Sequence, residues 1–166
     1  MVKVEKKLAE MGLELPKVPM DMETWARCKR AGNFIFMGTT AAWTYINKGE
    51  HEKLKGAIGR ERTVEEAKDI AKDCALSMLS ALKNELGDLD KVDAIVKLEV
   101  YLYGVGQYDI PDPNNPYPGY GPVADAASEL FIKLYGEKGR ATRTMTPFNG
   151  ITDITCELDL VVYVKD

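Results

Sequence analysis

Residues 63–87 carry the pattern that most constrains what this chain can fold into. Apolar side chains recur there at steps of three and four residues, which is typical of a long amphipathic helix. Thr63 and Glu66 form a capping-box pattern at its start, and Gly87 suits the left-handed position that ends many helices. A helix with one apolar face has to cover a second layer, so the rest of the chain must provide that layer.

Two segments show the alternation that is typical of strands with one apolar face. One is 154–164, where every second residue from Ile154 onward is apolar. The other is 92–103, for which we expect an inner face of Val96, Leu98, Val100 and Leu102 and an outer face of Lys97, Glu99, Tyr101 and Tyr103. The outer face mixes charged and aromatic residues, so we expect an oligomer to bury part of it.

Two turn signals predict hairpins. Gly32-Asn33 lies between a strand signal at 25–29 and the apolar run 34–37, which reads as a buried strand. Asn149-Gly150 follows the alternating segment 142–148, so we expect that segment to pair with the last strand.

The remaining segments are shorter. Pro122 stands near the start of a second apolar-striped helix that Gly136 ends. Residues 3–12 are predicted to form a short amphipathic helix that ends before Pro16. The pattern of residues 43–46 is compatible with the extension of a strand.

In chain order the main elements run strand, strand, helix, strand, helix, strand, strand. We therefore expect an α+β fold: a mostly antiparallel sheet with two helices packed on one face. Residues 1–166 fit a single domain, with an N-terminal helical extension over about residues 1–20. The loop 104–121 is dense in Gly, Pro and Tyr, and is either an ordered lid or a solvent-exposed insertion.

Composition excludes several classes of function. A net charge of -4 offers no basic surface for nucleic acid, and no apolar run is long enough to span a bilayer. Without a signal peptide pattern, we expect a cytoplasmic protein. The single His51 and three cysteines do not supply a metal site or a catalytic triad, and Cys74 and Cys156 read as core residues.

Three motifs, in this order and spacing, resemble the Rid (reactive intermediate deaminase, YjgF-like) superfamily. They are GNFIFMG at 32–38, the helix from 63 with its exit GDLDKV at 87–92, and YGEKGRATRT at 135–144. The resemblance implies a chorismate-mutase-like fold and a homotrimer with sites in clefts between subunits. It also implies hydrolysis of enamines and imines without a metal or cofactor.

The resemblance places the family's conserved arginine at Arg143 and its water-holding glutamate at Glu157. An arginine fork grips a carboxylate through two parallel hydrogen bonds, and a glutamate can orient water and accept its proton. The alternative without a function in ligand binding is that Arg143 is a surface arginine that pairs with an acidic neighbour. For Glu157 the alternatives are a solvated strand residue and an ion pair between subunits.

Five further residues match positions that line the family's cleft. Trp25 stands where many relatives have a tyrosine. A tryptophan buried in the core is an equally good interpretation of this residue. Gly38 and Thr39 stand for a Ser-Gly pair, and Met145 replaces a residue that is often cysteine or small. Asp125 stands where many relatives have asparagine, and its simpler interpretation is an aspartate near a helix start.

Two functions follow from these expectations. The first is an imine or enamine deaminase, in which Arg143 binds the carboxylate of a small imino acid and Glu157 activates water. The second is a metabolite-binding module that holds a carboxylate ligand in the same cleft without turnover.

Overall fold

The computed structural model describes residues 3–104, 120–148 and 153–165. The helices are α1 (Lys3–Glu10), α2 (Trp43–Asn47), α3 (Val64–Leu86) and α4 (Tyr120–Tyr135). The strands are β1 (Cys28–Ala31), β2 (Phe34–Thr40), β3 (Val92–Tyr103), β4 (Thr142–Phe148) and β5 (Cys156–Val164). Short 3-10 turns lie at His51–Leu54, Leu89–Lys91 and Gly136–Gly139. The loop predicted at 104–121 lies almost wholly outside the described residues.

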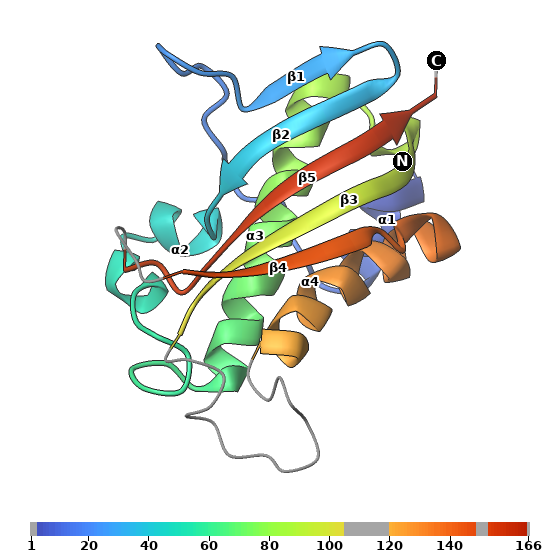
Figure 1. Ribbon diagram of the computed structural model, residues 1–166. Coiled ribbons are helices and arrows are strands. Elements are labelled where there is room, and N and C mark those ends of the chain that lie inside the picture. The colour runs from blue at the N-terminus through green and yellow to red at the C-terminus, as the bar shows by residue number, and fades with distance from the viewer. Residues whose placement is uncertain (1–2, 105–119, 149–152, 166) are drawn as a thin grey trace.

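The strands form one sheet in the order β1-β2-β5-β3-β4 (Figure 1). All neighbours are antiparallel except β3 and β4, which are parallel. The predicted turn at Gly32-Asn33 is confirmed, because Ala31 pairs with Phe34 across it. The strand before this turn begins at Cys28 and not at Trp25.

The predicted pairing of the last two strands is wrong. β5 lies between β2 and β3, whereas β4 lies on the far side of β3. α4 connects β3 to β4, and a helical crossover of this kind is what a parallel pair of strands requires. The Asn149-Gly150 signal is a local preference that does not decide between these arrangements, and those two residues lie outside the described ranges.

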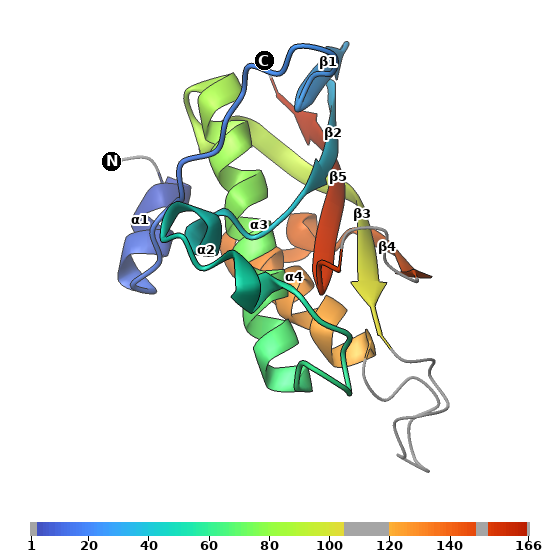
Figure 2. The same cartoon turned by 90° about the vertical axis from the view of Figure 1, so that its left-hand side faces the viewer.

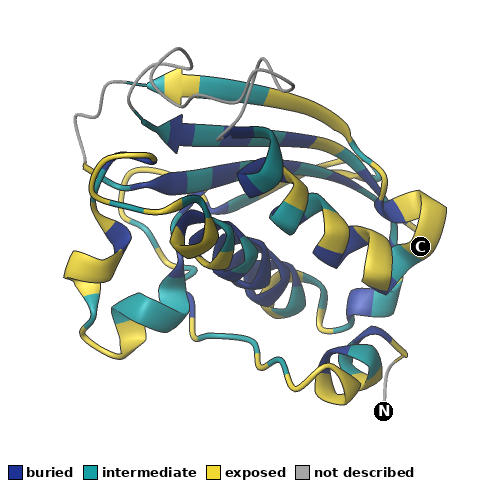
Figure 3. Cartoon of the chain, turned by 90° about the horizontal axis from the view of Figure 1, so that it is seen from below, coloured by how far each residue is buried: buried dark blue, intermediate teal, exposed yellow. Residues whose placement is uncertain are grey.

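The helices lie on one side of the sheet, as predicted (Figure 2). α3 packs against β5, β2 and α4, and α4 also packs against β3. α3 is buried along most of its length between the sheet and the segments outside it (Figure 3). Within the described ranges no helix covers the other face of the sheet, and no helix is long and apolar enough to cross a membrane.

Both predicted ends of α3 are confirmed. Thr63 accepts a hydrogen bond from the Glu66 amide, and the Glu66 carboxylate accepts one from the Thr63 amide at 2.8 Å. Gly87 ends the helix with φ 74°, a left-handed conformation that glycine adopts without steric cost.

Residues 43–46 form part of helix α2, so the strand extension expected there is wrong. The Trp43 amide donates to Ser77 Oγ and the Thr44 amide to Asp73 Oδ2, each at 2.9 Å. Two side chains of α3 thus accept hydrogen bonds from the free backbone amides in the first turn of α2. This replaces the side-chain cap that Ala42 cannot provide. This tertiary contact overrides a local pattern that favoured strand.

The face prediction for β3 holds for Leu98, Val100 and Leu102, but fails at Val96. The pairing with β5 shifts register between Ile95 and Lys97, so Ile95 is buried and Val96 is only half-buried. A bulge adds one residue and moves the side chains before it to the other face.

The N-terminal helix docks through its first turn. The amides of Lys3 and Val4 donate to the two carboxylate oxygens of Asp90 at 2.8 and 2.9 Å. The helix ends earlier than predicted, because Gly12 turns the chain with φ 66° before Pro16 is reached.

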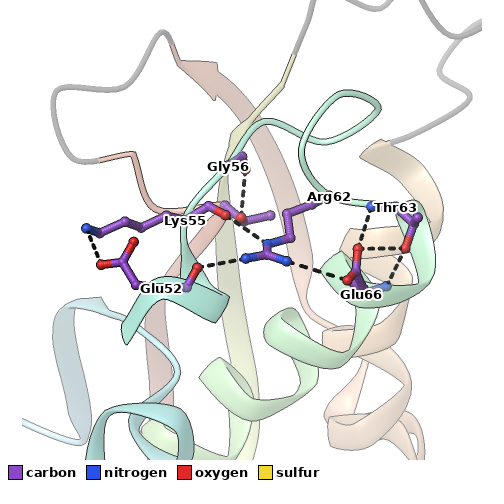
Figure 4. A network of polar contacts seen from close by, with 7 residues as sticks. Glu52, Lys55, Gly56, Arg62, Thr63 and Glu66 are labelled. Carbon is purple, nitrogen blue, oxygen red and sulfur yellow. Dashed lines mark hydrogen bonds and ion pairs between the residues drawn. The ribbon is translucent and has the colours of Figure 1, made fainter. Parts of the chain in front are cut away.

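Arg62 ties the segment before α3 to the start of that helix (Figure 4). Its Nη2 donates to the Glu52 carbonyl at 2.7 Å and its Nε to the Lys55 carbonyl at 2.8 Å. Its Nη1 lies 3.5 Å from the capping carboxylate of Glu66. One arginine therefore fixes the backbone between the 3-10 turn at His51–Leu54 and Thr63.

Candidate functional site

Arg143 lies on the edge strand β4 and points to the helix side of the sheet. Its register partner on β3 is the buried Leu98, and paired residues of adjacent strands project to the same face. Its Nη1 donates to Asp125 Oδ1 at 2.7 Å and to Ser128 Oγ at 3.1 Å, both on α4. The predicted alternative of an acidic partner is therefore present, and that partner is itself one of the predicted site residues.

The guanidinium of Arg143 still has unused donors. Among the described residues, hydrogen bonds are formed only by Nη1, so the edge made by Nε and Nη2 has no protein partner. The side chain is 26% exposed. Because Nε and Nη2 form a planar two-donor fork, this edge matches the two oxygens of a carboxylate.

Met145 follows Arg143 on the same side of β4, opposite the buried Val100 of β3. It is partly buried and packs against the apolar core. Asp125, Arg143 and Met145 therefore lie on the helix side of the sheet at the β4 edge.

Glu157 lies on the uncovered face of the sheet, in the middle strand β5. Its register partner is Tyr101 of β3, and it is half-buried. Burial raises the pKa of Glu157 above its ordinary value, and the neighbouring charge of Asp159 raises this pKa further. The glutamate thus holds its proton more readily than a solvated one.

Asp159 and Tyr101 form a hydrogen-bonded pair beside Glu157. The Tyr101 hydroxyl donates to Asp159 Oδ2 at 3.1 Å, while Asp159 Oδ1 is buried and has no partner among the described residues. Burial, followed by the charge of Asp159, raises the pKa of Tyr101 to about 12.

Trp25, Gly38 and Thr39 lie at the opposite edge of the sheet, on β2 and on the segment before β1. Trp25 is 45% exposed, which excludes the core reading, and a Cβ on Gly38 would stand 3.7 Å from the indole Cζ3. Thr39 is exposed, while Thr40 is buried.

The predicted site residues therefore fall into three groups within one chain. Asp125, Arg143 and Met145 lie at the β4 edge on the helix side, and Glu157 lies on the uncovered face. Trp25, with Gly38 and Thr39, belongs to the other edge. Arg143 and Glu157 cannot contact one small ligand in a single copy, because the sheet separates them.

Sequence reasoning missed several polar residues of these groups. Ser128 could have been found, because it lies three residues after Asp125 and hence on the same helix face. Arg27 carries no sequence signal of its own, yet it is 3% exposed and its guanidinium lies over the rings of two tryptophans. No local signal reveals the pairing of Tyr101 with Asp159, which depends on strand register.

The hollows formed by the described residues lie elsewhere. One of about 240 Å³ lies between α3 and α4 and is lined by Lys72 and Glu129 among others. Another of about 380 Å³ lies beside α1, with Lys7 and Lys138 in its wall. Within the described ranges, no three His, Cys, Asp or Glu side chains converge as metal ligands would.

Comparison with known proteins places the fold. No family model matches the sequence. The chain is 31% identical over 113 residues to protein TCP17 of Trypanosoma cruzi, a match that spans 64% of this chain and 65% of that protein, less than two thirds of its length.

Solved structures resemble the whole chain. A protein of unknown function from Agrobacterium tumefaciens (Atu1372) superposes with a TM-score of 0.82 and 23% identity, over 99% of this chain and 94% of that one. A candidate endoribonuclease of Shewanella oneidensis MR-1 gives 0.79 and 21%, over 98% and 99%. TdcF of E. coli with bound serine gives 0.54 and 12%, over 92% and 99%. The chain shares the YjgF-like, chorismate-mutase-like α+β fold of these neighbours.

Proposed function

We propose that the protein is an enamine or imine deaminase that hydrolyses a small imino acid to a 2-oxo acid and ammonia. The observation that carries the proposal is the geometry of Arg143. Asp125 and Ser128 hold one end of its guanidinium, and the Nε–Nη2 edge stays available for a ligand.

A carboxylate is the group that fits this edge. Two parallel charge-assisted hydrogen bonds satisfy both oxygens of a carboxylate, and each bond to a charged group contributes about 1.5–3 kcal/mol. The E. coli TdcF structure holds serine, which is itself a small molecule with a carboxylate. This supports an amino-acid-sized ligand.

Glu157 supplies the base that the reaction needs. The oxygen of a water molecule bonds to the imine carbon, and Glu157 accepts the proton that this water loses. As this bond forms, the π electrons of the carbon–nitrogen double bond move to the nitrogen, which takes the proton held by Glu157. The new hydroxyl then gives its remaining proton, through Glu157, to the nitrogen. The carbonyl forms as the carbon–nitrogen single bond breaks, and ammonia leaves with the electron pair of that bond. Burial raises the pKa of Glu157, which makes its carboxylate a stronger base toward the attacking water.

The proposed site needs more than one copy of the chain. Since the sheet separates Arg143 from Glu157, a ligand that contacts both must lie between two subunits, as in a homotrimer. The uncovered sheet face supports this assembly: Phe34 and Phe36 are 39% and 50% exposed. Phe34 also packs edge-on against Tyr163 with ring centroids 5.2 Å apart. A cluster of exposed aromatic rings of this kind favours burial against a partner.

The second candidate is a binding module that captures a carboxylate without turnover. It is favoured by the same separation, because a single chain offers the carboxylate fork without the base. A ribonuclease is disfavoured: Glu99, Glu157 and Asp159 share the uncovered face, where they would repel a phosphate backbone.

A coupled assay separates the two candidates. An amino-acid oxidase generates the imino acid, semicarbazide competes for it, and deaminase activity lowers the yield of semicarbazone. We expect the wild type to suppress semicarbazone formation and Arg143→Ala to lose this suppression. Arg140→Ala is the matched control, because Arg140 is exposed and bound only to Glu137 at 3.3 Å.

The outcomes are distinct. Full activity of Arg143→Ala would eliminate the deaminase proposal in the form given. If the wild type suppresses nothing with small, branched and aromatic imino acids, the binding module becomes the better account, and calorimetric titration with the 2-oxo acids tests it.

A further inference from the structure

Arg27 is buried without an acidic partner. It is 3% exposed, its Nε donates to the Pro19 carbonyl at 2.7 Å, and its Nη1 donates to Thr40 Oγ1 at 2.7 Å. Among the described residues no carboxylate pairs with it. Burial lowers the pKa of Arg27 below its ordinary value, as expected for a cation that lacks a counter-charge.

Two indole rings lie within cation–π distance of the Arg27 guanidinium. The Arg27 Cζ atom lies 5.1 Å from the ring centroid of Trp25 and 5.7 Å from that of Trp43. These are the only two tryptophans of the chain. Aromatic faces attract a guanidinium through their quadrupole, most strongly when both groups are shielded from water.

The two tryptophans differ in what holds them. Trp43 lies in α2 and is half-buried, and its amide is anchored by Ser77. Trp25 precedes β1 and is 45% exposed, and among the described residues its indole lies against Arg27 and Gly38. An exposed side chain on an irregular segment has rotamer freedom that only such contacts can remove.

Arg27 also connects the strands around Trp25. The Gly38 amide donates to the Arg27 carbonyl at 3.1 Å, which fixes Gly38 next to the indole. The bond to Thr40 runs from the residue just before β1 to the end of β2, where the pairing of β2 with β5 is irregular. The guanidinium is therefore fixed at both ends before Trp25 is added.

We infer that Arg27 is a positioning residue, whose guanidinium holds the exposed indole of Trp25 in one orientation as a rigid wall of the ligand site. The inference rests on the proposed function through one expectation, the family resemblance that puts Trp25 among the residues lining the cleft. The rigidity of the ring is a separate claim that can be tested without any ligand.

The first arm of the test follows the ring itself. In a Trp43→Phe background, Trp25 is the only fluorescent indole, and time-resolved anisotropy reports its motion. We expect the parent to depolarise only with tumbling of the whole protein, and Arg27→Met to add a fast sub-nanosecond component. Arg27→Lys keeps the charge without the planar fork, and should give an intermediate amplitude.

Controls separate positioning from folding. Arg30→Met removes an exposed arginine from β1, three residues after Arg27, and should leave Trp25 rigid. If Arg27→Met does not fold, as judged by circular dichroism, Thr40→Val decides, because it removes one anchor of the guanidinium and keeps Arg27. No fast component in folded Arg27→Met, or in Thr40→Val as its substitute, would overturn the inference.

The second arm measures turnover of imino acids in the coupled assay. A mobile wall weakens ground-state contacts, so Arg27→Met should raise KM about threefold or more and change kcat less than about twofold. A fall in kcat with KM unchanged contradicts the role. If the wild type shows no turnover, the proposed function fails, while the anisotropy arm still decides whether Arg27 fixes Trp25.

Discussion

The carboxylate of Asp125 lies 2.7 Å from Nη1 of Arg143, and this ion pair joins helix α4 to the edge strand β4. The pair has two effects on a ligand that approaches the free edge of the guanidinium. It fixes the orientation of that edge, and it cancels part of the positive charge that would attract a carboxylate. Asparagine, which many relatives of the resembled family have at this position, would keep the hydrogen bond without the charge.

Replacing Asp125 by asparagine is therefore expected to strengthen carboxylate binding. The Asp125→Asn protein should lower KM, or the Kd of a 2-oxo acid, by about two- to fivefold, since exposed ion pairs contribute at most about 1 kcal/mol. Calorimetric titration measures this directly. Asp125→Ala is the contrasting variant, because it removes the anchor as well and should weaken binding. Equal affinities in all three proteins would contradict this account.

Glu157 is expected to make stability depend on pH. Because its folded-state pKa is raised, the folded protein binds more protons than the unfolded chain between the ordinary value of 4.5 and the raised value. The contribution of Glu157 to stability is therefore lost as pH rises through this window. Relative to wild type, Glu157→Gln should be more stable at pH 7 than at pH 4, as urea unfolding at the two values measures. An identical stability difference at both pH values would show that the carboxyl titrates normally. Glu85→Gln, a change on α3 away from the uncovered face, serves as the control.

Gly139 is expected to tolerate no side chain. A Cβ there would overlap the carbonyl oxygen of Phe131 on α4, and backbone cannot move aside as a flexible side chain can. Gly139→Ala should destabilise the protein by at least about 2–3 kcal/mol, seen as a lower Tm. Gly121→Ala is the matched control, because a Cβ at that position of α4 meets nothing within 4 Å. Its Tm should stay the same or rise, since alanine favours helix.

Phe36 is expected to control assembly through the uncovered face. Phe36→Lys should convert a homotrimer to monomers, because the new charge would have to be buried without a partner. Light scattering coupled to size exclusion checks this against the 18.5 kDa mass of one chain. Met11→Lys changes another exposed apolar residue, on the segment after α1, and should leave the mass unchanged. A wild-type protein that is already monomeric would reject the trimer.

Local chemistry made much of the fold predictable from sequence. The ends of α3 depend on Thr63, Glu66 and Gly87, which act within a few residues of where they stand. The failures share a different cause. Trp43 is helical because side chains of α3 satisfy its first turn, and Val96 changes faces because of a bulge against β5. Such contacts join distant parts of the chain and leave no local pattern.

The site was predictable only in part for the same reason. The family resemblance proposed Arg143 as a ligand-binding residue, and the structure places Asp125 beside it and Met145 on the same side of β4. The resemblance could not reveal that the sheet separates Arg143 from Glu157, because this separation depends on the order of the strands and on the faces to which the two side chains point. The burial of Arg27 was not predicted, because the local sequence around a buried arginine does not differ from that around an exposed one.

The position of β5 between β2 and β3 also bears on how the chain is made. The ribosome delivers the β1–β2 hairpin first, and β3 with β4 later. Both units lack their neighbour β5 until residues 156–164 have emerged. Until then the hairpin and the β3–α4–β4 unit each present an unpaired strand edge, which is a template for unwanted pairing with other chains. Both of these edges are covered only when β5 pairs with β2 and β3, so the sheet is completed by the strand that leaves the ribosome after the other four.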